Sequence, residues 1–247
     1  GYRRQRQMCI RDSNWYVGQK QGEIWGYETY GLFQSEQEIA GAANQDKVSG
    51  GIKLMPGDIR FVDRNNDGVI DWGDNTVDNP GDKKIIGNST PRYHYGINLG
   101  ADWKGFDLGI FFQGVGKRDL YLPGTSFRSH YGSEWQVPSA YNNDYWTEEN
   151  TRAYFPRARF NGGSAINQAQ TRYMVDASYC RLKSVSIGYT LPKVLTQKAS
   201  IEKIRIYFTG ENLFTISDTP DGLDPELDNP YTYPMQRSLS VGLSLTF

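Results

Sequence analysis

The sequence predicts an all-β fold, the carboxy-terminal portion of a transmembrane antiparallel β-barrel with long extracellular loops. Three observations lead to this prediction. Several segments alternate apolar with small polar residues, their apolar positions carry no charge, and the connections between them alternate between short and long. Successive side chains of a strand point to opposite faces, so this alternation predicts strands with one apolar and one polar face. Barrels of the bacterial outer membrane need such strands, because lipid surrounds them and the lumen is polar.

The last ten residues show the alternation most clearly. One face would carry Leu239, Val241, Leu243, Leu245 and Phe247, and the other Ser238, Ser240, Gly242, Ser244 and Thr246. The small, uncharged polar face suits a lumen, and a terminal aromatic suits the interface between lipid and water. An edge strand of a soluble β-sandwich has the same local pattern, so this segment alone leaves both folds open.

Similar segments occur throughout the chain. We predict six strands, near residues 24–33, 93–103, 106–115, 172–191, 203–211 and 235–247. The last five should form one antiparallel sheet with neighbours in sequence order, whereas a sandwich would divide them between two sheets.

The connections support the barrel. Residues 33–91, 116–171 and 212–234 form long connections, whereas Lys104-Gly105 and residues 192–202 form short ones. Outer-membrane barrels place short turns on the periplasmic side and long loops outside. Phe247 would then lie at the periplasmic rim with Trp103, Phe106 and Tyr189, as an aromatic girdle requires.

Composition excludes some functions. The 27 Lys and Arg residues balance 28 Asp and Glu residues, so no nucleic-acid-binding surface is indicated. The two cysteines are too few for a disulfide framework. We expect no signal peptide at the start of the chain, and we expect residues 1–13 to be an adapter-derived artefact and residues 14–247 to be the barrel segment.

Eight short motifs follow one another in an order that resembles one family. They are Pro56–Phe61, Asp63–Asp74, Ile85–Asn88, Phe106–Leu108 with Phe112–Gly114, Tyr145–Thr147, Leu182-Lys183 with Gly188–Pro192, Glu211–Phe214 and Gly222–Glu226. This series, spread over residues 24–247, resembles the SusC/RagA family of TonB-dependent outer-membrane importers.

The resemblance implies the carboxy-terminal part of a 22-stranded barrel that imports glycan or peptide fragments. It implies a SusD-like surface lipoprotein as a lid, outer-membrane lipid around the wall, and energy from the TonB complex through an amino-terminal part outside this chain. Separately, the residues themselves show no catalytic arrangement, so we expect that the protein is not an enzyme. We keep one alternative, a soluble, calcium-stiffened β-domain that binds glycans.

One loop matches the pattern of a calcium site. Its proposed ligands are Asp63, Asn65, Asp67, the Val69 carbonyl, Asp71 and Asp74, with Gly68 at the sharp turn. Ca²⁺ needs six or more oxygen ligands, which this spacing supplies. The last position is Asp rather than Glu, and an Asx-rich turn without metal is the alternative. We predict a structural Ca²⁺ site.

No catalytic arrangement is visible. The two histidines, His94 and His130, lack metal-ligand spacing, and we expect His94 on the lumen face and His130 in a loop. The pairs Asp224/Glu226 and Glu148/Glu149 resemble a glycosidase dyad, but we expect solvated loop charges.

The connection near residues 121–160 is rich in aromatic residues. They are Tyr121, Phe127, Tyr131, Trp135, Tyr141, Tyr145, Trp146, Tyr154 and Phe155. We expect most of them to form the loop's own core, with a helical turn around residues 139–150. Contact with the lid lipoprotein or the substrate is the alternative.

Overall fold

The computed structural model describes residues 16–121, 144–159, 163–196, 201–220, 223–227 and 232–247. The chain divides into two compact units. The first comprises residues 1–90 and 120–174, and the second comprises residues 91–119 and 175–247. The predicted artefact at residues 1–13 and His130 lie outside the described residues.

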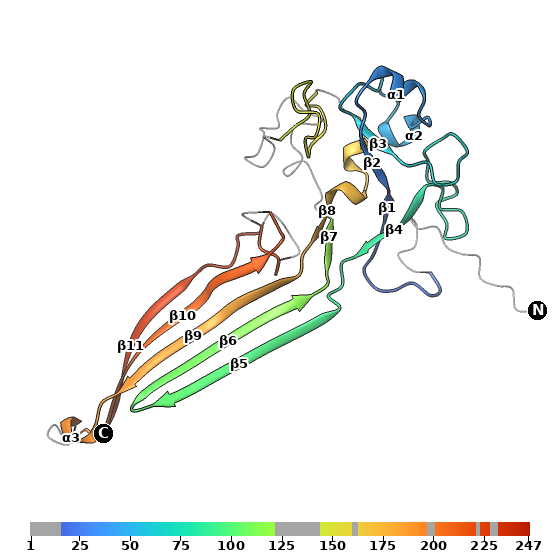
Figure 1. The fold of residues 1–247 in the computed structure, drawn as a ribbon. Helices are drawn as coiled ribbons and strands as arrows, with labels where there is room; N and C mark the ends of the chain where they lie inside the picture. Colours follow the sequence, from blue (N-terminus) through green and yellow to red (C-terminus); the bar gives the residue numbers. More distant parts are fainter. Residues whose placement is uncertain (1–15, 122–143, 160–162, 197–200, 221–222, 228–231) are drawn as a thin grey trace, which may run out of the picture. The chain divides into compact units, whose positions relative to one another are not determined.

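A single five-stranded sheet dominates the second unit (Figure 1). Its strands, in spatial order, are β5 (Tyr93–Trp103), β6 (Phe106–Gly116), β9 (Tyr179–Thr190), β10 (Lys203–Ser217) and β11 (Ser238–Thr246). All neighbouring strands are antiparallel. The prediction of one sheet with neighbours in sequence order is therefore confirmed, although the strand predicted at residues 172–191 begins only at Tyr179. The strand lengths suit a bilayer, because a tilted membrane strand needs about 9–11 residues.

The register places the apolar residues of all five strands on one face. One row across the sheet consists of Trp103, Phe106, Tyr189, Ile206 and Leu243. The face is uncharged along the paired strands and lies open in this structure: Trp103 is 68% exposed and Val241 is 78% exposed. A sandwich would bury this face against a second sheet, whereas a barrel turns it towards lipid.

The tight turn between β5 and β6 has the expected conformation. Lys104 and Gly105 both have positive φ, 48° and 89°, as in the type I′ turns that join twisted hairpin strands. The short connection from β9 to β10 contains α3 (Lys193–Thr196). Figure 1 shows α3 and the carboxy-terminus at the same end of the sheet as this turn. Phe106 and Tyr189 also pack there, with ring centroids 4.5 Å apart.

The first unit is built from short elements. They are β1 (Glu23–Tyr27), β2 (Thr29–Leu32), α1 (Glu36–Ala40), α2 (Asp46–Ser49), β3 (Ile59–Phe61), β4 (Lys83–Asn88), and the 3-10 turns η2 (Ala165–Asn167) and η3 (Thr171–Tyr173). β1 pairs with β4, and β2 pairs with β3. The buried side chains of Phe33, Val48, Ile59 and Ile70 form its core. β7 (Asp119–Tyr121) and β8 (Met174–Asp176) pair with each other.

Two expectations about this region were wrong. Residues 24–33 form two strands with different partners rather than one, and residues 33–91 contain α1, α2, β3 and β4 rather than only a loop. The physical reason is burial on both sides: Tyr27 and Phe33 are almost completely buried. A packed core needs no alternating pattern, so the sequence pattern did not reveal these elements.

No helix among the described residues is long and apolar enough to cross a membrane.

Candidate functional site

The polar face of the five-stranded sheet is lined mainly by small residues. Along β9 and β11 it presents Ser184, Ser186, Gly188, Ser238, Ser240, Gly242 and Ser244. His94 lies on this face, as predicted from the alternation. Small, hydrogen-bonding residues leave room for water and solute next to the wall, so this face has the character of a lumen lining.

One ion pair crosses this polar face. Arg205 on β10 and Asp107 on β6 are not on adjacent strands, because β9 lies between these two strands: Asp107 pairs with Gly188, and Arg205 pairs with Thr190, two residues further along β9. The Nε of Arg205 nevertheless donates to Oδ1 of Asp107 at 2.9 Å, and a second bond joins its Nη2 to Oδ2. A Cβ on Gly188 would lie 2.5 Å from both Arg205 Nε and Asp107 Oδ1. The absence of a side chain at residue 188 therefore makes space for the pair.

One strand further along, a glycine again makes space for a side chain of the neighbouring strand. Tyr207 pairs in register with Gly242 of β11, and a Cβ on Gly242 would lie 2.2 Å from the Tyr207 ring. The Arg205 guanidinium lies 4.8 Å from the centroid of that ring. Arg205 is thus fixed by a carboxylate on one side and by an aromatic ring on the other. These contacts connect four of the five strands across the polar face.

A second charged cluster joins a loop to the sheet. Arg181 of β9 is only 3% exposed, and its guanidinium contacts three partners. Nη2 pairs with Asp224, Nη1 pairs with Glu226 at 2.7 Å, and Nε donates to the Thr215 hydroxyl at 2.8 Å. Lys183 adds an ion pair with Glu226 at 3.0 Å. We call these charged residues, Arg181, Lys183, Asp224 and Glu226, the loop clamp.

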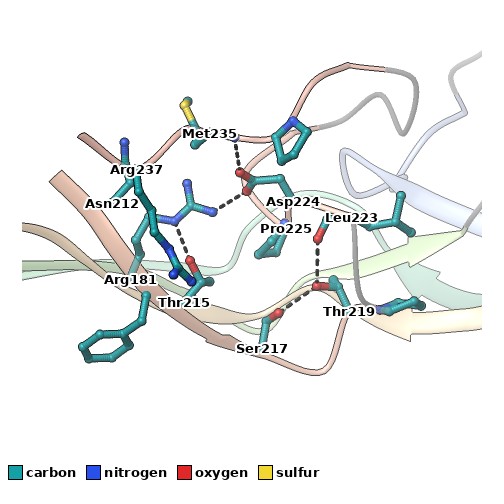
Figure 2. Close-up of a pocket in the computed structure, with 13 residues that line it drawn as sticks. Arg181, Asn212, Thr215, Ser217, Thr219, Leu223, Asp224, Pro225, Met235 and Arg237 are labelled. Carbon is teal, nitrogen blue, oxygen red and sulfur yellow. Dashed lines mark hydrogen bonds and ion pairs between the residues drawn. The ribbon is translucent and has the colours of Figure 1, made fainter. Parts of the chain in front are cut away.

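A hollow of about 270 Å³ lies beside the loop clamp (Figure 2). Figure 2 shows Asp224 between Arg181 and the backbone of Met235, whose amide donates to it at 2.9 Å. Burial by itself raises the pKa of Asp224. The hydrogen bonds from Arg181 and from the amides of Met235 and Glu226 outweigh burial and hold this pKa below its ordinary value. Asp224 is therefore a buried carboxylate that stays charged.

The expectation that Asp224 and Glu226 are solvated was wrong. Asp224 has a side chain only 3% exposed, and Glu226 lies in the same ion-pair network. Arg181 is more than forty residues away in sequence, and only the sheet brings it to them. Glu148 and Glu149 are exposed, as expected.

The predicted calcium loop is held by its own hydrogen bonds. The Asp63 carboxylate accepts from the amides of Asn66 and Gly68 at 2.7 and 2.8 Å. Asn66 and Gly68 have positive φ, 58° and 83°, which fits the sharp turn. Asp67 accepts from the Val69 amide and from the Asn65 side chain, both at 2.8 Å.

The two later residues of the pattern have other partners. Asp71 forms an ion pair with Lys47 at 2.7 Å, which with the Gly73 amide lowers its pKa. Asp74 accepts from Asn79. Among the described residues, no three His, Cys, Asp or Glu side chains converge as metal ligands. The calcium site therefore stays a prediction.

The aromatic residues of the 121–160 connection that the structure describes are largely packed. Trp146 is 3% exposed and Phe155 is 4% exposed, and Tyr154 packs edge-on against Phe155. This agrees with the expected local core. Phe127, Tyr131, Trp135 and Tyr141 lie outside the described residues, as does the first part of the predicted helical turn, and residues 144–150 are not helical.

Comparisons with known proteins agree with this architecture. The chain is 31% identical to TonB-dependent receptor P3 of Formosa agariphila over 93% of its own length and 22% of the receptor. It is 29% identical to TonB-dependent receptor SusC of Bacteroides thetaiotaomicron over 76% of its length and 17% of SusC. Its fold matches the RagAB peptide importer in the open-open state with a TM-score of 0.66, 20% identity, and coverage of 94% of this chain and 23% of the other.

The chain is thus similar, along most of its length, to a segment of TonB-dependent receptors of the SusC/RagA type. No protein-family model matches it. TonB-dependent receptors of this type are proteins of the Gram-negative outer membrane, which accounts for the uncharged apolar face. The chain spans less than a quarter of the P3 receptor and of SusC.

Proposed function

We propose that the parent protein is a TonB-driven importer of glycan or peptide fragments and that this chain contributes part of its wall and extracellular loops. The observation that carries the proposal is the two-faced sheet. Five paired strands present a continuous uncharged apolar face, and their other face is polar and lined with small residues. This is the division of surface that a lipid-embedded passage requires. The sheet likewise favours this proposal over a soluble glycan-binding domain.

The proposal includes partners outside this chain. A SusD-like surface lipoprotein would close the extracellular side, and the TonB complex would act through the amino-terminal part of the receptor. The support is similarity alone: the relatives are named TonB-dependent receptors, including SusC, and a structural neighbour is the RagAB peptide importer. None of these names describes an enzyme, so we propose a transport role without catalysis.

Uptake by living cells tests the proposal. Bacteria carrying the full-length receptor should accumulate labelled glycan or peptide fragments, and deletion of its gene should abolish that uptake. A strain without TonB, as the energy control, should lose uptake while keeping binding at the cell surface. Unchanged uptake in the deletion strain for every fragment that induces the gene would contradict an import function.

We also propose that the loop Asp63–Asp74 binds Ca²⁺ as a stiffening ion. The ligand spacing and the turn at Gly68 support this, and binding would require Asp71 to exchange Lys47 for the ion. Calorimetry on the intact receptor should show Ca²⁺ binding that Asp67→Ala abolishes and the exposed-surface control Glu149→Gln leaves unchanged. No heat with the unaltered receptor, or the same heat with Asp67→Ala, would show that the loop is only a turn.

A further inference from the structure

A second hollow, of about 390 Å³, lies within the first unit and combines an exposed aromatic ring with arginines. Its lining comes from β2, β3, the start of α1, the loop at residues 151–153 and η3. The residues used below are Tyr30, Gln34, Glu38, Arg60, Arg152 and Arg172, which we call the arginine pocket.

Tyr30 is displayed by an irregularity in its strand. In the pairing of β2 with β3, Thr29 is opposite Phe61 and Gly31 is opposite Arg60, so Tyr30 is the extra residue of a β-bulge. A bulge re-aims the side chain that it carries. Gly31 accommodates it with a φ of 137°, a conformation that other residues avoid. Tyr30 is consequently 74% exposed, although its strand neighbour Leu32 is buried.

Arg60 supports the ring of Tyr30. Its guanidinium carbon lies 4.6 Å from the centroid of that ring and 5.8 Å from that of Phe33. A guanidinium stacked on aromatic rings keeps its N–H groups directed sideways, where they remain available to an anion. Within the described part of the chain, neither Arg60 nor Arg152 forms an ion pair. The positive charge of the pocket is therefore not neutralised by protein carboxylates at these two side chains.

The frame of the pocket is fixed. Arg172 donates to the carbonyl of Tyr154 at 2.7 Å and to that of Ala153, so it holds the loop that carries Arg152. Gln34 donates to the Thr151 carbonyl at 3.3 Å and accepts from the Trp146 indole at 3.3 Å. The one carboxylate of the lining, Glu38, accepts a hydrogen bond from the backbone amide of Gln34 at 2.8 Å. The lining therefore carries three arginines and one carboxylate, which gives it an excess of positive charge.

From this arrangement we propose that the arginine pocket binds an acidic oligosaccharide, which deepens, and rests on, the proposed import function. The open face of the Tyr30 ring stacks on a sugar ring, and Arg60 and Arg152 take its carboxylate or sulfate group. An acidic peptide is the less favourable ligand, because the lining has few apolar side chains to receive those of a peptide. The charge of the ligand, not its size, is what this site recognises.

Binding to the purified full-length receptor in detergent tests the proposal. The probes are a galacturonic acid trisaccharide, its methyl ester, a sulfated galactose trisaccharide, its desulfated form, and triglutamate. The receptor should bind at least one acidic sugar more tightly than its neutral counterpart, and the two pairs tell carboxylate from sulfate. Arg60→Ala and Arg152→Ala should each weaken acidic-sugar binding about 10- to 100-fold, as expected for a charge-assisted hydrogen bond.

One further variant separates stacking from charge recognition, and another serves as a control. Tyr30→Ala should weaken acidic and neutral sugars alike, because it removes the stacking surface. Lys53→Ala removes the same unit of charge from an exposed residue outside the pocket and should change nothing. Resistance of the barrel to unfolding by detergent, measured on gels, shows that each variant is folded.

Three results of the binding experiment would overturn the proposal. They are no binding of either acidic sugar, an acid preference that survives both arginine substitutions, and tighter binding of triglutamate through the same arginines. Because this binding needs neither cells nor energy, its outcome is independent of the uptake test. A receptor that imports its substrate normally with Arg60→Ala and Arg152→Ala would refute only the pocket.

Discussion

Arg205 and Asp107 form an ion pair across an intervening strand, over the Cα of Gly188. The pair links β10 to β6 on the polar face, where hydrogen bonds between neighbouring backbones cannot reach. It therefore ties three strands together at one point of the wall. A charged pair at the water-filled side also avoids the desolvation cost that it would incur on the lipid side.

Gly188→Ala should destabilise the barrel, because the new Cβ would overlap both Arg205 and Asp107. We expect only a small loss in the free energy of unfolding, because the overlapping atoms are the ends of flexible, partly exposed side chains that can turn away and give up the ion pair. Unfolding of the full-length receptor by urea in the presence of lipid vesicles measures this change in the free energy of unfolding. Gly109→Ala is the matched control, since a Cβ there has no atom within 4 Å. Equal loss in both variants would show that the effect comes from the strand and not from the ion pair.

Arg181→Ala should release the loop that carries Asp224 and Glu226. Removing one partner of a buried ion pair leaves a buried charge unpaired, which costs about 3–5 kcal/mol. Hydrogen exchange should show faster exchange at the amides of Glu226 and Met235, which now donate to Asp224. The control Arg64→Ala, at an exposed position, should leave these amides protected. Unchanged exchange in Arg181→Ala would contradict the role of the loop clamp.

The stability contributed by Asp224 should depend on pH. Its pKa is lower in the folded state than in the unfolded state, so the stabilisation is present above the unfolded value and is lost as pH falls through the folded value. The difference in unfolding free energy between the unaltered receptor and Asp224→Asn should therefore shrink as the solution is acidified. A difference independent of pH would contradict a charged Asp224.

The sequence predicted the wall better than the loops, and the reason is physical. β5, β6 and β11 lie between lipid and lumen, so each position is assigned to one solvent and the period of two survives in the sequence. Lys104-Gly105 was equally readable, because a two-residue hairpin requires positive φ. These features depend on neighbours in sequence.

The features that were missed depend on distant residues. The partners of Arg181 come from a loop beyond β10, and the bulge at Tyr30 depends on its pairing with β3. Nothing local in the sequence distinguishes Asp224, which is buried, from Glu148, which is exposed. Burial of a charge is decided by the sheet that carries its partner, so these contacts could not be predicted from the local pattern.

The central claim is that the apolar face of the sheet contacts lipid, and a pair of lysine substitutions in β11 tests it most directly. Val241 lies on the apolar face and Ser240 on the polar face of the same strand. In the full-length receptor, Val241→Lys should make membrane insertion less favourable by about 2–4 kcal/mol near the bilayer centre, and Ser240→Lys should do so by far less. Folding titrations into lipid vesicles measure both. Equal insertion of the two variants would contradict a lipid-facing strand.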